Sequence, residues 1–167
     1  VDSLQQKGLL TINVYAMISN TKENMEYFLE AGPIKTDKLT VRSFKVYADG
    51  ALGSRGAALK NPYTDSNSHY GKFITSKDSI EKLAYKLATT PFQMNTHAIG
   101  DDANKAVLNA YRKALVFSDD PRWRIEHAQI IDTADIQLFN RKIIPSVQPT
   151  HATSDMYWAE DRLGSEG

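Results

Sequence analysis

The sequence predicts an α/β protein with parallel strands, arranged as part of a (β/α)₈ barrel. Apolar, β-branched segments alternate with helical segments along the chain, which is typical of parallel sheets with crossover helices. Ionisable groups recur where the strands end, at Asp49, His97 and His127. The carboxyl ends of barrel strands share one mouth, whereas a doubly wound sheet collects its ligands at a single switch point. The recurrence favours the barrel.

The length of the chain limits how much of a barrel it can form. The chain has 167 residues, and a closed eight-stranded barrel typically needs about 250. We count five strands. We therefore expect a single partial barrel domain, residues 1–167, that covers the middle of the barrel, roughly strands 3 to 7.

The spacing of apolar residues places the individual elements. The clearest helices show apolar residues at i, i+3, i+4 and i+7, and Ser76 is a suitable N-cap for one of them. Residues 50–75 carry no such period and are predicted to form a long loop, a length that is common in functional loops. The expected strands are residues 11–18, 40–48, 93–97, 124–127 and 143–147, and the expected helices begin near residues 20, 76, 101 and 132.

Composition excludes several classes of partner. Basic and acidic residues number 20 each, so no net field attracts nucleic acid or an anionic membrane. No apolar run approaches the roughly 20 residues that span a bilayer. The chain contains no cysteine, so a metal must be held by histidine, carboxylate or modified lysine. We expect a cytoplasmic enzyme that acts on a small-molecule substrate.

Lys45 is the first candidate for chemistry. In its strand Phe44 and Val46 share one face, which we expect to meet the outer helices, and Lys45 takes the opposite face toward the barrel interior. A buried, unpaired ammonium is very costly. Lys45 therefore needs either a carboxylate partner or carboxylation by carbon dioxide, which gives an anionic carbamate able to bridge two metal ions. The residues alone leave both open.

Two histidines at the ends of successive strands are the candidate metal ligands. His97 shares a polar strand face with Asn95. His127 is less clear, because Ile125 shares its face. A lone histidine is usually structural, but two neutral imidazoles from adjacent strands can hold one Zn²⁺ and leave a position for a hydroxide. We expect one or two divalent ions, with zinc as first choice, although such ligands also suit Fe²⁺ and Mn²⁺.

Four further residues are expected near the site. Asp101 can orient an imidazole from the second coordination sphere or cap its helix, and the cap is the interpretation we favour. Asp49 and His151 are predicted to contact the substrate. Residues 50–56 contain three glycines and Arg55, which suggests a lid whose arginine meets an anionic substrate group. A phosphate-binding loop is the competing interpretation, although the segment matches neither common phosphate-loop pattern.

Four segments together resemble a known family. They lie in order between about Val14 and Gly164, and they are similar to the YtcJ-like branch of the amidohydrolase superfamily, the metal-dependent hydrolases of amidohydrolase family 3. The segments are KVYADGALGSR (45–55), NTHAIGD (95–101), RIEHAQ (124–129) and SVQPTH (146–151).

This resemblance implies a distorted (β/α)₈ barrel that hydrolyses amide or other C–N bonds with a metal-activated water. It implies that Lys45 occupies the fourth-strand metal-bridging position, often a carboxylated lysine, and that His97 and His127 are the fifth- and sixth-strand ligands. It also implies a first-strand His-x-His pair and an eighth-strand Asp, which have no counterpart in this sequence. We therefore expect a fragment that is weakly active or inactive alone.

Two other functions remain open from the sequence. One is a non-catalytic half-barrel that forms a homo-oligomer through the open edges of its sheet. The other is a phosphate-binding barrel enzyme that uses residues 50–56. Retention of metal would favour the hydrolase, and self-association without metal would favour the half-barrel.

Overall fold

The computed structural model describes residues 1–165, so the last two residues of the predicted domain lie outside it. At its centre is a six-stranded sheet in which β1, β3, β4, β5 and β6 are parallel and adjacent in that order, while the short β2 pairs antiparallel with β3. The strands are β1 (Val14–Ser19), β2 (Ile34–Lys35), β3 (Leu39–Tyr47), β4 (Gln93–Ala98), β5 (Trp123–His127) and β6 (Ile143–Ser146).

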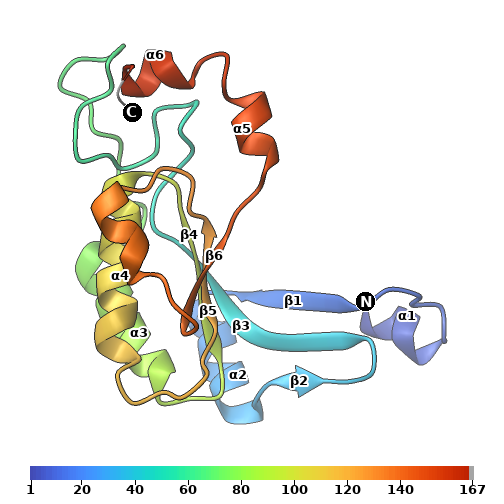
Figure 1. Cartoon of the computed structure of the whole chain (residues 1–167). Helices are drawn as coiled ribbons and strands as arrows, with labels where there is room; N and C mark the ends of the chain where they lie inside the picture. Colours follow the sequence, from blue (N-terminus) through green and yellow to red (C-terminus); the bar gives the residue numbers. More distant parts are fainter. Residues whose placement is uncertain (166–167) are drawn as a thin grey trace.

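The parallel strands follow one another across the sheet in sequence order. A doubly wound sheet reverses its order at a switch point, whereas a barrel wall does not. The two long helices α3 and α4 lie side by side on one face of the sheet (Figure 1). The helices are α1 (Asp2–Gln6), α2 (Lys22–Ala31), α3 (Lys77–Ala88), α4 (Asp101–Ala114), the 3₁₀ helix η1 (Thr133–Leu138), α5 (Thr150–Ser154) and α6 (Ala159–Leu163).

The hydrophobic core fills the space between the sheet and these helices. Phe44, Val46 and Met94 point from the strands into it and are buried. Lys45 and Tyr47 alternate with them and take the other face of the sheet, where Tyr47 is 51% exposed. The alternation predicted for this strand is confirmed. It places the polar residues of the strand on the face that lines the interior of a barrel.

The long loop and the last two helices gather at one end of the molecule (Figure 1). The backbone N–H of Thr64 donates to the carbonyl of Arg162, and the Thr64 hydroxyl donates to the carbonyl of Asp161. This is the end at which the parallel strands finish. The predicted loop of residues 50–75 therefore borders the mouth, and α6 lies against it.

Some elements differ from the sequence prediction. The helix predicted to begin near residue 132 is present as a 3₁₀ helix, and Asp132 caps it by accepting from the N–H of Ala134. Gly100, not Asp101, is the N-cap residue of α4. The short elements α1, β2, α5 and α6 were not predicted, because two to five residues are too few to show a period.

Among residues 1–165, none of the helices is long and apolar enough to cross a membrane. The cytoplasmic location stays a prediction.

Leu87 tests the packing of α3 on the sheet. Its side chain is fully buried, so Leu87→Ala should lower the free energy of unfolding by about 2–5 kcal/mol, through lost burial and the cavity left behind. Tyr85 on the same helix is 48% exposed, and Tyr85→Ala is expected to change it by only about 0.5 kcal/mol. Urea denaturation measures both, and equal midpoints for the two variants would contradict this packing.

Candidate metal centre

Lys45, His97 and His127 come from three neighbouring strands and lie near one another at the mouth. The imidazole ring centroids of His97 and His127 are 4.6 Å apart. The Lys45 Nζ lies 5.1 Å from the ring centroid of Tyr47, and that ring lies 5.5 Å from the imidazole of His97. The charge of Lys45 acts on both imidazoles. The structure thus brings together the three residues predicted as metal ligands.

A strained backbone directs His127 to this position. Simple alternation would put His127 on the helix-facing side of β5 with Ile125, which is buried in the core. However, His127 has φ 75° and Ala128 has φ 44°. Left-handed values cost a non-glycine residue roughly 1–3 kcal/mol each and cluster at functional sites. The turn brings the imidazole of His127 against His97, and within 5.9 Å of the ring centroid of His151.

Hydrogen bonds leave one ring nitrogen of His97 and one of His127 with a lone pair. Nε2 of His97 donates weakly to the Gly50 carbonyl at 3.4 Å, and Nδ1 of His127 donates to Oε1 of Gln148 at 2.6 Å. Each bonded nitrogen must carry the proton, because both acceptors are amide oxygens. The unprotonated nitrogens are then Nδ1 of His97 and Nε2 of His127. Sequence reasoning missed Gln148, since its contact depends on strand neighbours far apart in the chain.

Both imidazoles are held in the neutral state. The pKa of His97 is lowered to about 4, chiefly by burial; the hydrogen bond to the Gly50 carbonyl opposes this shift, and the nearby His127 and Lys45 add to it. Burial also lowers the pKa of His127. Neutral imidazole is the form that binds a metal ion. Desolvation therefore prepares both rings as ligands at neutral pH.

Burial acts in the same direction on Lys45, whose pKa is lowered. The charge of Glu126 opposes the shift and that of Arg124 adds to it. Glu126 is itself bonded to Nε of Arg124 at 2.7 Å, so it is not a dedicated partner for the ammonium. A lowered pKa increases the fraction of neutral amine, the form that reacts with carbon dioxide. Carboxylation of Lys45 stays a prediction.

These residues suit part of a metal site. Within residues 1–165, no three side chains of the His, Cys, Asp and Glu types are grouped so that they could hold a metal ion by themselves. Two neutral imidazoles supply two nitrogen ligands, and a carbamate on Lys45 would add an anionic oxygen. The donor set fits a divalent metal once Lys45 is included.

Asp49 has a different position from the one we expected. Its side chain is fully buried, and its carboxylate accepts hydrogen bonds from the backbone N–H of Ala58, Ile99 and Gly100 at 2.8–3.0 Å. These three hydrogen bonds occupy the carboxylate and do not favour the predicted contact with a substrate. They indicate a structural role for Asp49. Asp49 is also the carboxylate beside His97, with 3.6 Å between Oδ1 and Nε2.

Asp101 and Arg55 are also engaged elsewhere. The carboxylate of Asp101 accepts from the backbone N–H of Lys60 and Asp102, so it is occupied by main chain rather than by an imidazole. Arg55 forms a two-point ion pair with Asp65 at 2.8 and 2.9 Å. Its guanidinium is neutralised there, which does not favour the predicted contact with an anionic substrate group.

The chain is similar to several known proteins. A family model described as "Amidohydrolase family" matches residues 2–167. The chain belongs to the amidohydrolase family. It is 37% identical over 125 residues to the putative amidohydrolase YtcJ of Bacillus subtilis (strain 168) and 28% identical over 164 residues to the protein LONG AFTER FAR-RED 3 of Arabidopsis thaliana. These alignments cover 74% and 96% of this chain but only 23% and 28% of those proteins.

Two solved structures are also similar. An uncharacterized metal-dependent hydrolase from Pyrococcus furiosus superposes with a TM-score of 0.86 at 32% identity, and one from Pyrococcus horikoshii OT3 with 0.85 at 29%. The match covers 99% of this amidohydrolase chain and 34% and 33% of those chains. The predicted fold class is confirmed.

Asp49→Ala tests the structural role of this carboxylate. The variant leaves three buried N–H groups without an acceptor, at roughly 1–3 kcal/mol each, so the free energy of unfolding should fall by several kcal/mol. Amide exchange at Ala58, Ile99 and Gly100 should accelerate. Asp37→Ala, at an exposed position, is the control and should change stability by about 0.5 kcal/mol at most. Unchanged exchange at all three amides would count against the assignment.

Gln148→Leu tests the orientation of His127. Without the acceptor, Nδ1 no longer needs to carry the proton, so ¹⁵N imidazole shifts should show more of the Nε2–H tautomer. Metal affinity should fall roughly 10–100-fold, as for other partners of ligand histidines. Gln148→Glu keeps an acceptor and should restore the tautomer. Gln137→Leu, at an exposed position in η1, is the matched control. An unchanged His127 tautomer in Gln148→Leu would refute the role.

Proposed function

We propose that this chain contributes the central strands and part of the metal centre of a metal-dependent amidohydrolase, which cleaves amide or other C–N bonds with an activated water. The observation that carries the proposal is the pair of neutral imidazoles, 4.6 Å apart, on adjacent strand ends beside Lys45. Membership of the amidohydrolase family and the likeness to metal-dependent hydrolases support it. The chain spans 23–28% of the curated relatives named above, so the activity of the whole protein is part of the proposal.

Each residue has a defined task in this proposal. His97 would hold the metal through Nδ1 and His127 through Nε2, while Gly50 and Gln148 fix the two rings by their hydrogen bonds. Carboxylated Lys45 would supply an anionic oxygen. A divalent ion such as Zn²⁺, when bound, polarises a carbonyl and lowers the pKa of a water molecule.

His151 is the proposed substrate-contacting residue among these groups. It lies beyond the end of β6, and its ring centroid is 5.9 Å from that of His127. An imidazole so close to a metal ligand can donate a hydrogen bond to a substrate or accept one from it.

The structure of residues 50–56 does not favour the alternative function, a phosphate-binding enzyme. The N–H groups of Gly50, Arg55 and Gly56 donate to carbonyls within the same segment. A phosphate cradle needs such groups free and pointing at the anion. Together with the pairing of Arg55 and Asp65, this leaves the segment with few donors for an anion.

Self-association is the second candidate, because the sheet has two outer parallel strands. In the path of parallel strands, β1 pairs on one side with β3, and β6 pairs on one side with β5. Tyr15 and Met17 of β1 are each 38% exposed. Open edges of this kind can pair with another chain. The elution volume of the purified chain in gel filtration tests whether it self-associates.

Elemental analysis of the purified chain, after gel filtration in metal-free buffer, tests the metal centre. We expect near-stoichiometric zinc or another transition metal in the unaltered chain. His97→Ala and His127→Ala each remove one of two imidazole ligands, so each should weaken metal binding about tenfold or more. His69→Ala is the matched control, because His69 is exposed in the long loop and bonds the Arg55 carbonyl. Equal metal content in all four proteins would exclude the assignment.

A further inference from the structure

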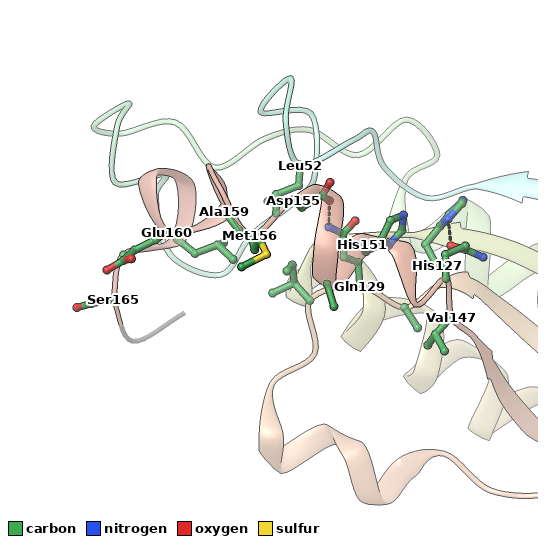
Figure 2. A pocket seen from close by; sticks show the side chains of 16 residues that line it. Leu52, His127, Gln129, Val147, His151, Asp155, Met156, Ala159, Glu160 and Ser165 are labelled. Carbon is green, nitrogen blue, oxygen red and sulfur yellow. Dashed lines mark hydrogen bonds between the residues drawn. The ribbon is translucent and has the colours of Figure 1, made fainter.

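A cavity of about 540 Å³ opens directly beside the candidate metal centre. It lies between the ends of β5 and β6 on one side and helices α5 and α6 on the other, and Leu52 of the long loop also lines it. Figure 2 shows His127 and His151 toward one end and Glu160 toward the other. The volume is within the range of roughly 300–1,000 Å³ for small-molecule sites. The cavity therefore extends away from the metal ligands and can hold one part of a substrate.

The walls of this cavity are mostly apolar. Leu52, Ile130 and Leu163 belong to one hydrophobic cluster beneath it. Met156 and Val147 also line it, yet they are 62% and 59% exposed. Large apolar side chains exposed at a concave site are stabilised when a ligand covers them. The surface is suited to an apolar group.

The polar groups in the cavity are largely satisfied by one another. Gln129 donates to Oδ2 of Asp155 at 2.7 Å, and the Ser154 hydroxyl donates to Oδ1 of Asp155, also at 2.7 Å. Nδ1 of His127 is bonded to Oε1 of Gln148. Apart from His151 at the metal-binding end, few donors thus remain to orient a polar substituent.

The charges at the cavity disfavour an anion. Among the described residues that line it, the charged side chains are the acids Asp155 and Glu160, and neither lysine nor arginine is present. Arg55, the residue expected from the sequence to meet an anionic group, is bound by Asp65 and does not line the cavity. Away from the His127 end, a carboxylate or phosphate on the substrate would face two acids and neither a lysine nor an arginine.

We propose that the cavity selects amides that carry a bulky, uncharged apolar group next to the scissile carbonyl, and that Met156, Val147 and Leu163 determine this specificity. The carbonyl would lie at the His127 end and the apolar group toward α6. The position of the carbonyl rests on the proposed function, whereas the preference for an apolar group rests on the cavity alone.

Binding of two amides that share one skeleton and differ in charge tests the inference without any turnover. 4-Phenylbutyramide is neutral and apolar, and its para-carboxylate derivative carries an anionic group on the ring. Ligand-observed NMR titration of the whole chain should show phenylbutyramide binding at least about tenfold more tightly. Met156→Asp and Val147→Asp place a charge at exposed cavity positions that tolerate it, and each should weaken phenylbutyramide binding by about tenfold.

Tyr157→Asp is the matched control, because Tyr157 is 83% exposed, adjoins Met156 and does not line the cavity. It should leave the affinity unchanged. Equal affinity for the two amides would overturn the inference, and so would phenylbutyramide binding that the two cavity variants leave intact.

Metal content, measured on the same samples, separates this inference from the proposed function. Loss of metal with the apolar preference retained would count against the hydrolase and leave the cavity assignment standing. Retained metal with no apolar preference would support the metal centre and reject the specificity.

Discussion

The carboxylate of Asp49 accepts hydrogen bonds from the backbone N–H of Ala58, Ile99 and Gly100, and so joins the end of β3, the long loop and the turn into α4. Burial raises its pKa to about 6, although the three N–H donors act to lower it. The segments approach so closely that a Cβ on Gly100 would lie 2.0 Å from the Ala58 carbonyl oxygen. His97 directly precedes this turn, so the position of a candidate ligand depends on this junction.

The strand ends could be predicted from the sequence because two local rules fix them. A period of two assigns each residue of a strand to a face, which placed Lys45 opposite Phe44, and the parallel order of strands brings their carboxyl ends to one edge. The first rule needs only neighbouring residues in the sequence, and the second needs only the alternation of strands and helices along the chain. Hence the strand positions, their parallel order and the gathering of Lys45, His97 and His127 were predictable.

Other parts of the site depend on interactions that leave no local pattern. Alternation would have assigned His127 to the core side, and only its left-handed backbone, adopted by a non-glycine residue, reverses this. Asp49 was expected at the mouth because it follows the end of a strand. Its burial could not be predicted, since the backbone N–H groups that bond it come from segments up to 51 residues away. Gln148 reaches His127 from the segment that follows the neighbouring strand β6. The cavity needs helices of five residues, which are too short to recognise by periodicity.

The ion pairs of Asp65 fasten the long loop to α6. Its carboxylate is bonded to Arg55 in the loop and to Arg162 in the helix. The ring of Trp158 lies so close to Gly53 of the loop that a Cβ on Gly53 would be 3.3 Å from it. The far wall of the cavity is therefore placed by a surface loop and not by the strands that carry the histidines. An insertion or deletion in that loop during evolution would move α6 while leaving Lys45, His97 and His127 in register. The shape of the cavity can thus change without any change in the strands that carry the candidate metal ligands.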